Sequence, residues 1–455
     1  MSKKNWKKIA LGVTSALIAS VLIACGGDTD TPTGDGDGAA GEGTVYYLNF
    51  KPEIADQIED LAEQYTEETG IEVKMTTAAS GTYEETLRAE ITKSAPPTIF
   101  FINGPIGYNN WKDYTLDLND TVLGDWLTDP SLAQMGDDDG LYGMPITVEG
   151  YGLIYNNAIM DEYFASDNKS TNYTSMDEIN NLDTLTEVVE DMTALKDELG
   201  IEGVFSSTSL ASGEQWRFQT HLANLPIYYE YEDKGVESLE EIDFTYSENY
   251  KDIFDLYLNN STTAPGLLGS KTTTDSMTEL ALGQSVMVQN GNWGWGQIAD
   301  TEGNVVNEED IRFLPIYIGV DGEEDQGLAI GTENFLSINS QAAEEDIQAS
   351  LDFLEWMYTS EVGKDYVINE FGFIPTFNTF EDDELPTDPL AQSVIESMND
   401  ESKYSVPWMF TTFPSEQFKN DFGDQLLLYA QDQADWEQVE QTVTDSWARE
   451  AQMSQ

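Results

Sequence analysis

Apolar positions after residue 44 switch between the period of a strand and the period of a helix, which predicts a parallel sheet with crossover helices. Continuous apolar runs are typical of buried strands, and repeats every three or four positions are typical of amphipathic helices. The predicted order is strand 45–50, helix 53–69 closed by Gly70, strand 71–75, a helix through Leu87 and Ile91, and strand 98–102. Ligands of such sheets bind beyond the carboxyl ends of the strands. The loops at 49–51, 80–83 and 103–108 are therefore candidate binding loops.

The segment from Gly140 to Asn157 predicts a hinge between two lobes. Two apolar runs, Met144 to Val148 and Tyr151 to Tyr155, are separated only by Glu149 and Gly150. Glycine tolerates the dihedral changes of a hinge, and an acid beside an aromatic at such a joint would face the ligand between the lobes. The alternative interpretation is a surface hairpin.

The remaining pattern predicts a second α/β lobe followed by a helical C-terminal part. Apolar residues from Leu182 to Leu199 have helical spacing and end at Gly200. A polar loop, 206–213, precedes Trp216, which would lie either in the core or at the site. A strand at 285–289 leads into two tryptophans, Trp293 and Trp295. Helices are expected over 388–455, interrupted by an aromatic loop at 406–410 that contains Trp408.

The N-terminus has the pattern of a bacterial lipoprotein signal. Four lysines precede an uncharged apolar run from Ile9 to Ala24, and Cys25 follows small residues. This arrangement resembles a lipobox, after which Cys25 would become the lipidated N-terminus. A plain secretory peptide is the alternative. Residues 26–43 hold Gly, Asp, Thr, Pro and Ala with almost no large apolar side chain, which predicts a disordered tether.

Composition narrows the classes of chemistry. With 85 acidic and 20 basic residues, the formal net charge is −65, which disfavours nucleic acid and anionic lipid as partners. Cys25 is the only cysteine, so the folded part has neither disulfides nor thiolate metal sites. The single histidine, His221, is more often structural than catalytic. We find no phosphate loop with a GKS or GKT ending, and we expect no cofactor and no metal.

Several motifs in order resemble the maltose-binding-protein branch of the extracellular solute-binding proteins, family 1, which serve carbohydrate ABC importers. They are residues 69–73, 145–149, 153–156, the Asn-Gly-Asn-Trp-Gly-Trp run at 290–295, Phe313-Leu314-Pro315, and the segment 351–363 followed by Pro375. The resemblance covers residues 44 to about 380. It departs from the maltose-binding pattern at Asn103-Gly104-Pro105, which puts maltodextrin in doubt and leaves carbohydrate as the ligand class.

The resemblance implies a periplasmic-binding-protein-like α/β fold, with two α/β lobes joined by a multi-crossing hinge around a central cleft. The predicted division is a signal peptide at 1–24, a tether at 25–43, a first lobe at 44–148 plus about 333–378, and a second lobe at about 151–330 plus 380–455. The chain would return to the first lobe near 327–334 and cross a third time near 378–383.

The resemblance also implies a set of ligand-binding residues. A tryptophan covers the apolar face of a sugar ring, while amides, carboxylates and lysine bind its hydroxyls. The predicted contacts are Lys51, Tyr83, Asn103, Glu149, Tyr151, Trp216, Asn292, Trp293, Glu333, Asn334 and Trp408. Trp293 is the expected stacking residue, and Trp295 is expected to be structural.

The function implied is a non-enzymatic, lipid-anchored binding protein at the outer face of the cytoplasmic membrane. It would close on a sugar, most simply an oligosaccharide, and deliver it to ABC-transporter permease subunits as a monomer held to the membrane only by its lipid. Two alternatives stay open. One is a binder of another polar solute, such as a polyamine or an organic anion, and the other is a secreted glycan-active enzyme with two carboxylates across the cleft.

Overall fold

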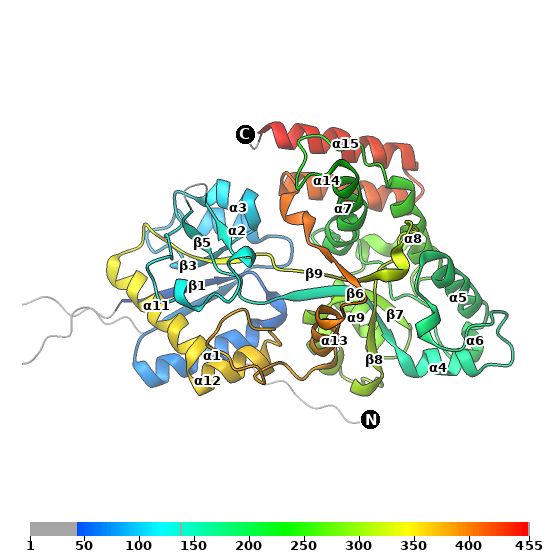
Figure 1. Ribbon diagram of the computed structural model, residues 1–455, viewed down its shortest axis with the longest axis horizontal. Helices are drawn as coiled ribbons and strands as arrows, with labels where there is room; N and C mark the ends of the chain where they lie inside the picture. Colours follow the sequence, from blue (N-terminus) through cyan, green and yellow to red (C-terminus); the bar gives the residue numbers. More distant parts are fainter. Residues whose placement is uncertain (1–42, 137–138, 454–455) are drawn as a thin grey trace, which may run out of the picture. The chain divides into compact units, whose positions relative to one another are not determined.

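Residues 43–136 and 139–453 are described by the structure, a computed structural model, and they form two α/β lobes, each built on one principal sheet (Figure 1). The predicted lipidation residue Cys25, the signal peptide and the tether up to residue 42 lie outside the described residues. The predicted α/β fold class is confirmed.

The first lobe contains a four-stranded sheet in the order β10-β3-β1-β2. Its strands are β1 (Val45–Asn49), β2 (Val73–Thr77), β3 (Ile99–Ile102) and β10 (Phe335–Ile338). β1 pairs in parallel with β2 and β3, as the helix-strand alternation predicted, and β10 joins β3 in antiparallel orientation. The carboxyl ends of β1 and β3 thus lie at one edge of the sheet, together with the start of β10.

Both faces of the first sheet are covered at β1 and β3, which explains why these two strands are apolar along most of their length and fully buried. Tyr47 and Phe101 pack on one side with α1 and α11, whereas Leu48 and Phe100 pack on the other side with α2 and α3 (Figure 1). The helices of this lobe are α1 (Ala55–Thr69), α2 (Tyr83–Glu90), α3 (Gly104–Trp111), α11 (Glu344–Thr359) and α12 (Glu361–Asp365). A small hairpin, β4 (Gln134–Met135) and β5 (Leu141–Gly143), completes the lobe.

The second sheet is organised around β6 (Glu149–Asn156), which is buried along its whole length. β6 pairs with β7 (Met287–Gly291) on one edge, and with β9 (Gln326–Gly331) and then β8 (Ile311–Leu314) on the other. β11 (Tyr404–Pro407) runs parallel to β9. The surrounding helices are α4 (Asn157–Ala165), α5 (Leu182–Ala194), α6 (Lys196–Leu199), α7 (Ala223–Lys234), α8 (Ser247–Asn259), α9 (Thr273–Ala281), α10 (Trp295–Ala299), α13 (Pro389–Asn399), α14 (Glu416–Ala430) and α15 (Trp436–Met453).

Two local predictions are wrong. Met144 to Val148 is not a strand: Met144 and Val148 each make one isolated bridge, and Glu149 and Gly150 lie inside β6 instead of forming a loose joint. Pairing of Glu149 and Gly150 with β9 fixes their backbone. The expected loop at 406–410 also begins as strand β11, because its residues complete the ladder of β9, which is distant in sequence.

The chain passes between the lobes at three places. β6 begins at Glu149, directly after the bridge between Val148 and Ile374. The segment between β9 and β10 returns to the first sheet. Phe377 packs in the core of the first lobe and Leu390 in a core of the second, so the third passage lies between them.

Candidate functional site

The first two crossings meet side by side, and polar side chains gather where they meet. Glu149 at the start of β6 is paired in register with Gly331 at the end of β9. Glu333 follows Gly331 by two residues, and Asn103 stands between the carboxyl end of β3 and the first residue of α3. The sheet topology therefore brings together residues that are about 230 positions apart in the sequence.

Lys51 and Glu149 form a buried ion pair at this junction. The Lys51 Nζ lies 2.6 Å from the Glu149 carboxylate and 3.4 Å from that of Glu53. The side chain of Asn49 fixes the turn after β1, since it accepts from the Lys51 N–H at 3.0 Å and donates to the Lys51 carbonyl at 2.7 Å. Burial disfavours the ammonium, but Glu149 and Glu53 outweigh this effect and raise the pKa of Lys51 above its usual value. Lys51 is therefore a fixed cation.

Next to this pair lies an aromatic cluster from the second lobe. We define it as Tyr151, Trp216, His221, Trp293, Trp408 and Phe410. His221 stacks on Tyr151 with ring centroids 4.5 Å apart, and its ring lies 5.2 Å from Trp216 and 5.4 Å from Trp293. Lys51 Nζ lies 5.7 Å from the ring centroid of Trp293, so the ion pair and the cluster are in contact.

A π-helix places two of the cluster's rings together. Residues Arg217–Leu222 form a π-helix with Trp216 at its N-terminal end. Its wider turn brings residues five apart onto one face, so Trp216 and His221 meet edge to face. Burial, together with the nearby Lys419, Arg217 and Lys51, lowers the pKa of His221 to about 3. His221 is a neutral ring at physiological pH.

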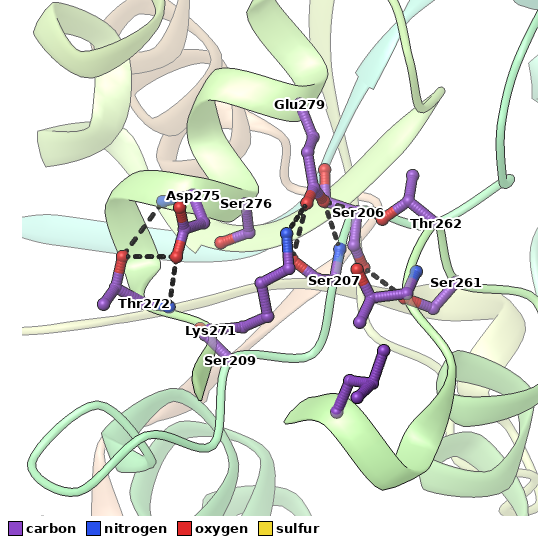
Figure 2. A network of polar contacts seen from close by, with 12 residues as sticks. Ser206, Ser207, Ser209, Ser261, Thr262, Lys271, Thr272, Asp275, Ser276 and Glu279 are labelled. Carbon is purple, nitrogen blue, oxygen red and sulfur yellow. Dashed lines mark hydrogen bonds and ion pairs between the residues drawn. The ribbon is translucent and has the colours of Figure 1, made fainter. Parts of the chain in front are cut away.

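The loop before Trp216 is held by a satisfied polar network (Figure 2). The buried Glu279 carboxylate accepts from the Ser207 N–H at 2.6 Å, the Ser207 hydroxyl at 3.0 Å, the Thr262 hydroxyl at 2.7 Å and Lys271 Nζ at 2.9 Å. Arg217, which is 1% exposed, donates to the Gln289 carbonyl at 2.9 Å. These bonds tie the 206–213 loop to α9, and they tie Arg217, the residue after Trp216, to β7.

Glu333 is a carboxylate of the site that has few partners. Its carboxylate accepts one long hydrogen bond, from Asn103 Nδ2 at 3.5 Å, and it makes no ion pair within the described part of the chain. Burial and the nearby Glu149 raise the pKa of Glu333 to about 7, against the opposing effects of Lys419 and Lys51. Glu333 therefore exchanges a proton near neutral pH.

Two further predicted residues, Asn292 and Tyr83, make positioning contacts, and a third, Asn334, lies at a turn. Asn292 is buried and accepts from the Gly150 N–H at 3.0 Å. Asn334 has a positive φ of 55° at the turn from β9 into β10. The Tyr83 hydroxyl accepts from the Phe101 N–H at 2.7 Å and donates to the Leu48 carbonyl at 3.5 Å, so it faces the first sheet. Their contact with a ligand stays a prediction.

Several residues of the site were not predicted from the sequence. Phe50 and Phe373 flank Lys51, at 5.2 and 5.7 Å from its Nζ. Phe410 completes the aromatic cluster, and His221 had been interpreted as structural. Only the position of Phe50 at a strand end carried a signal. The place of His221 depends on the π-helix and that of Phe410 on the packing after β11, whereas Phe373 comes from the core of the first lobe.

The two lobes touch beside the site. Ser80 Oγ donates to the Gly213 carbonyl at 3.4 Å. A Cβ added at Gly81 would lie 2.8 Å from the same oxygen, and one added at Gly104 would lie 2.9 Å from Thr411 Cβ. These close approaches mean that the loops at the ends of β2 and β3 meet the second lobe without room for side chains.

Over residues 43–136 and 139–453, no group of three or more His, Cys, Asp or Glu side chains is arranged to hold a metal ion. A search of the same residues finds no helix with the length and apolar character of a membrane span.

Known structures share this two-lobe architecture. A chitin oligosaccharide binding protein matches with a TM-score of 0.70 and 17% identity over 91% of this chain and 100% of that one. The solute-binding protein RafE in complex with raffinose matches with a TM-score of 0.68 and 16% identity, covering 90% and 99%. A sugar transporter protein from Bacillus licheniformis in complex with stachyose matches with a TM-score of 0.67 and 15% identity, over 90% of this chain and 100% of that one. At these identities the likeness defines the fold alone, a periplasmic-binding-protein-like fold of two α/β lobes.

The family is established by sequence. Residues 60–393, well over half of the chain, match the family described as bacterial extracellular solute-binding protein, and the chain belongs to that family. The predicted resemblance is thus confirmed. Comparison with curated protein sequences gives no significant match.

Proposed function

We propose that the protein captures a sugar, most simply an oligosaccharide, between its lobes and delivers it to the permease of an ABC importer. The observation that carries the proposal is the aromatic cluster, with Trp216, Trp293 and Trp408 beside the charged pair Lys51 and Glu149. Flat indole faces suit the apolar face of a sugar ring, and the fixed charges suit its hydroxyls. Proteins of similar fold that bind chitin oligosaccharide, raffinose and stachyose support the same ligand class.

Delivery requires that the permease distinguish loaded from empty protein, which lobe closure provides. In the proposed arrangement the ligand stabilises the contacts of the Ser80 and Gly104 loops with the second lobe. Lipidation at Cys25 would hold the monomer at the outer face of the cytoplasmic membrane, so that released sugar enters the permease directly. Tyr83, Asn103, Tyr151, Asn292, Glu333 and Asn334 complete the proposed set of ligand-binding residues.

The proposal is tested by titrating the protein with neutral mono- and oligosaccharides while the melting temperature and binding heat are measured. A bound sugar raises the melting temperature by mass action. Trp293→Ala should weaken binding by about 1–3 kcal/mol, the typical value of an aromatic stacking contact. Trp295→Ala is the matched control: Trp295 packs with Met277 and Ile298 away from the cluster, so its loss should lower stability and leave affinity unchanged.

A glycan-active enzyme is the second candidate, because one observation favours it. A carboxyl group with a pKa near 7, such as that of Glu333, has the acidity of a general acid in a glycosidase. The second carboxylate of the site, Glu149, is held by Lys51 at 2.6 Å, which favours binding over catalysis. Incubation with oligosaccharides decides between them: cleavage products would contradict the binding function.

A further inference from the structure

The site already binds one ammonium group, that of its own lysine. Lys51 Nζ lies against the Glu149 and Glu53 carboxylates and within 6 Å of the ring centroids of Phe50, Phe373 and Trp293. Carboxylates and aromatic faces together stabilise a desolvated cation. The ammonium of Lys51 is therefore fully engaged without a ligand.

Glu333, on the neighbouring crossing, lacks such a cation. The charged groups around it are Lys51 after β1, Glu149 on β6, and Lys419 and Glu416 on α14. Both lysines are already engaged, because Lys51 is bound to Glu149 and Lys419 Nζ lies 2.7 Å from Glu416. With Glu53 included, these groups carry four negative and two positive charges when all are ionised. A further cation beside Glu333 would reduce this excess of negative charge.

Unpartnered polar atoms flank the same segment. Trp408 is 6% exposed and packs against Gly331, and its Nε1–H has no acceptor among the described residues. The buried hydroxyl of Thr332, next to Glu333, also has no partner there. A buried N–H without an acceptor costs free energy, so it favours a ligand that supplies an oxygen.

We propose that the site takes a saccharide carrying a protonated amine, with Glu333 as the carboxylate that binds the ammonium and Trp408 as a donor to a ring oxygen or hydroxyl. The inference rests on the sugar-binding function proposed above and names its substrate class. An amino sugar supplies both a cation and oxygen acceptors. A neutral sugar supplies only the acceptors, and a polyamine supplies only the cation.

Proton release gives this ligand class a distinctive signature. At about pH 6 the free protein holds a proton on Glu333, whose pKa is about 7, and the ligand amine is charged. An ammonium bound at the carboxylate stabilises its ionised form, so Glu333 gives up that proton. Binding should then release close to one proton per ligand, which calorimetry in buffers of different ionisation enthalpy measures directly.

The experiment compares three series of equal chain length, from mono- to tetrasaccharides, with the full-length protein at about pH 6. One series carries free amines (oligomers of glucosamine and of galactosamine), one carries their N-acetyl forms, and one carries hydroxyl groups instead. Spermidine is included as a polyamine. We expect an amine-bearing member to bind at least about tenfold tighter than its N-acetyl and hydroxyl counterparts, with proton release.

Glu333→Gln tests the residue itself, because it keeps the shape and hydrogen-bonding capacity of the side chain while removing its charge. It should abolish both the preference for the amine and the proton release, while Glu302→Gln, at an exposed position, should change neither. Equal or tighter binding of the neutral sugars would overturn the amine subsite and leave the sugar-binding function intact. Binding of spermidine alone, or of no saccharide, would overturn the proposed function as well.

Discussion

Glu279 in the second lobe and Glu333 on the crossing from β9 to β10 are both shielded carboxylates, but they differ in the number of hydrogen bonds that they accept. Glu279 accepts four hydrogen bonds from Ser207, Thr262 and Lys271, all within its own lobe (Figure 2). Glu333 accepts one long bond, from Asn103 of the other lobe. A satisfied network makes a loop rigid, whereas an unsatisfied carboxylate retains its capacity for a ligand. Glu279 therefore belongs to the scaffold of the protein, and Glu333 belongs to its candidate site.

The largest expected effect comes from removing the satisfied carboxylate. Glu279→Ala leaves the Ser207 N–H and Lys271 without their acceptor, and we expect the free energy of unfolding to fall by about 3 kcal/mol. Glu333→Ala should cost about 1 kcal/mol or less at about pH 5, because it removes one long hydrogen bond. Urea denaturation measures both, with Glu302→Ala as an exposed control expected within about 0.5 kcal/mol of wild type. Equal losses in the free energy of unfolding for Glu279→Ala and Glu333→Ala would contradict the proposed difference between the two carboxylates.

The second test uses pH to sharpen the same contrast. The folded-state pKa of Glu333 is about 7, above its ordinary value of 4.5, so the folded chain holds a proton that the unfolded chain releases. The contribution of Glu333 to stability is therefore complete below about pH 4.5 and is lost as the pH rises through about 7.

Glu333→Gln cannot ionise and should keep that contribution at all pH values. Its stability relative to wild type should rise by about 2 kcal/mol between about pH 5 and about pH 8, as measured by urea unfolding. Parallel pH curves for the two proteins would show that the Glu333 carboxyl is not shielded in the folded state.

The smallest effect concerns the contact between the lobes at Gly81. Gly81→Ala would place a Cβ 2.8 Å from the Gly213 carbonyl oxygen and oppose closure, so ligand affinity should fall about tenfold, or about 1.4 kcal/mol. Gly200→Ala is the matched control: its φ is also +69°, but nothing lies within 4 Å. Both variants should lose about 1–2 kcal/mol of stability from backbone strain. Only Gly81→Ala should bind ligand more weakly, and equal affinities would contradict closure through this contact.

The sequence predicted the parts of the fold that depend on local periodicity. The parallel order of β1, β2 and β3 followed from alternating strand and helix patterns and is confirmed. Motif order also selected Lys51, Glu149 and Trp293, which the structure brings together. Their roles in ligand binding stay predictions.

The errors arose where distant segments decide local structure. Glu149 and Gly150 looked like a loose joint, but pairing with β9, about 180 residues later, makes them strand. β11 was missed because its ladder partner lies almost 80 residues earlier. The position of His221 depends on a π-helix, whose five-residue spacing no α-helical pattern shows.

The packing of Trp408, Trp293 and Trp216 has an optical consequence. Indole emission depends on the polarity and hydrogen bonding around the ring, and the ring of Trp293 lies 6.2 Å from that of Trp216 and 6.3 Å from that of Trp408 between centroids. Trp408 has an Nε1–H with no acceptor in the described structure, so its emission responds to any group that arrives to accept it. The protein therefore carries a native fluorophore inside its own candidate site, where occupancy can be followed by light without a label.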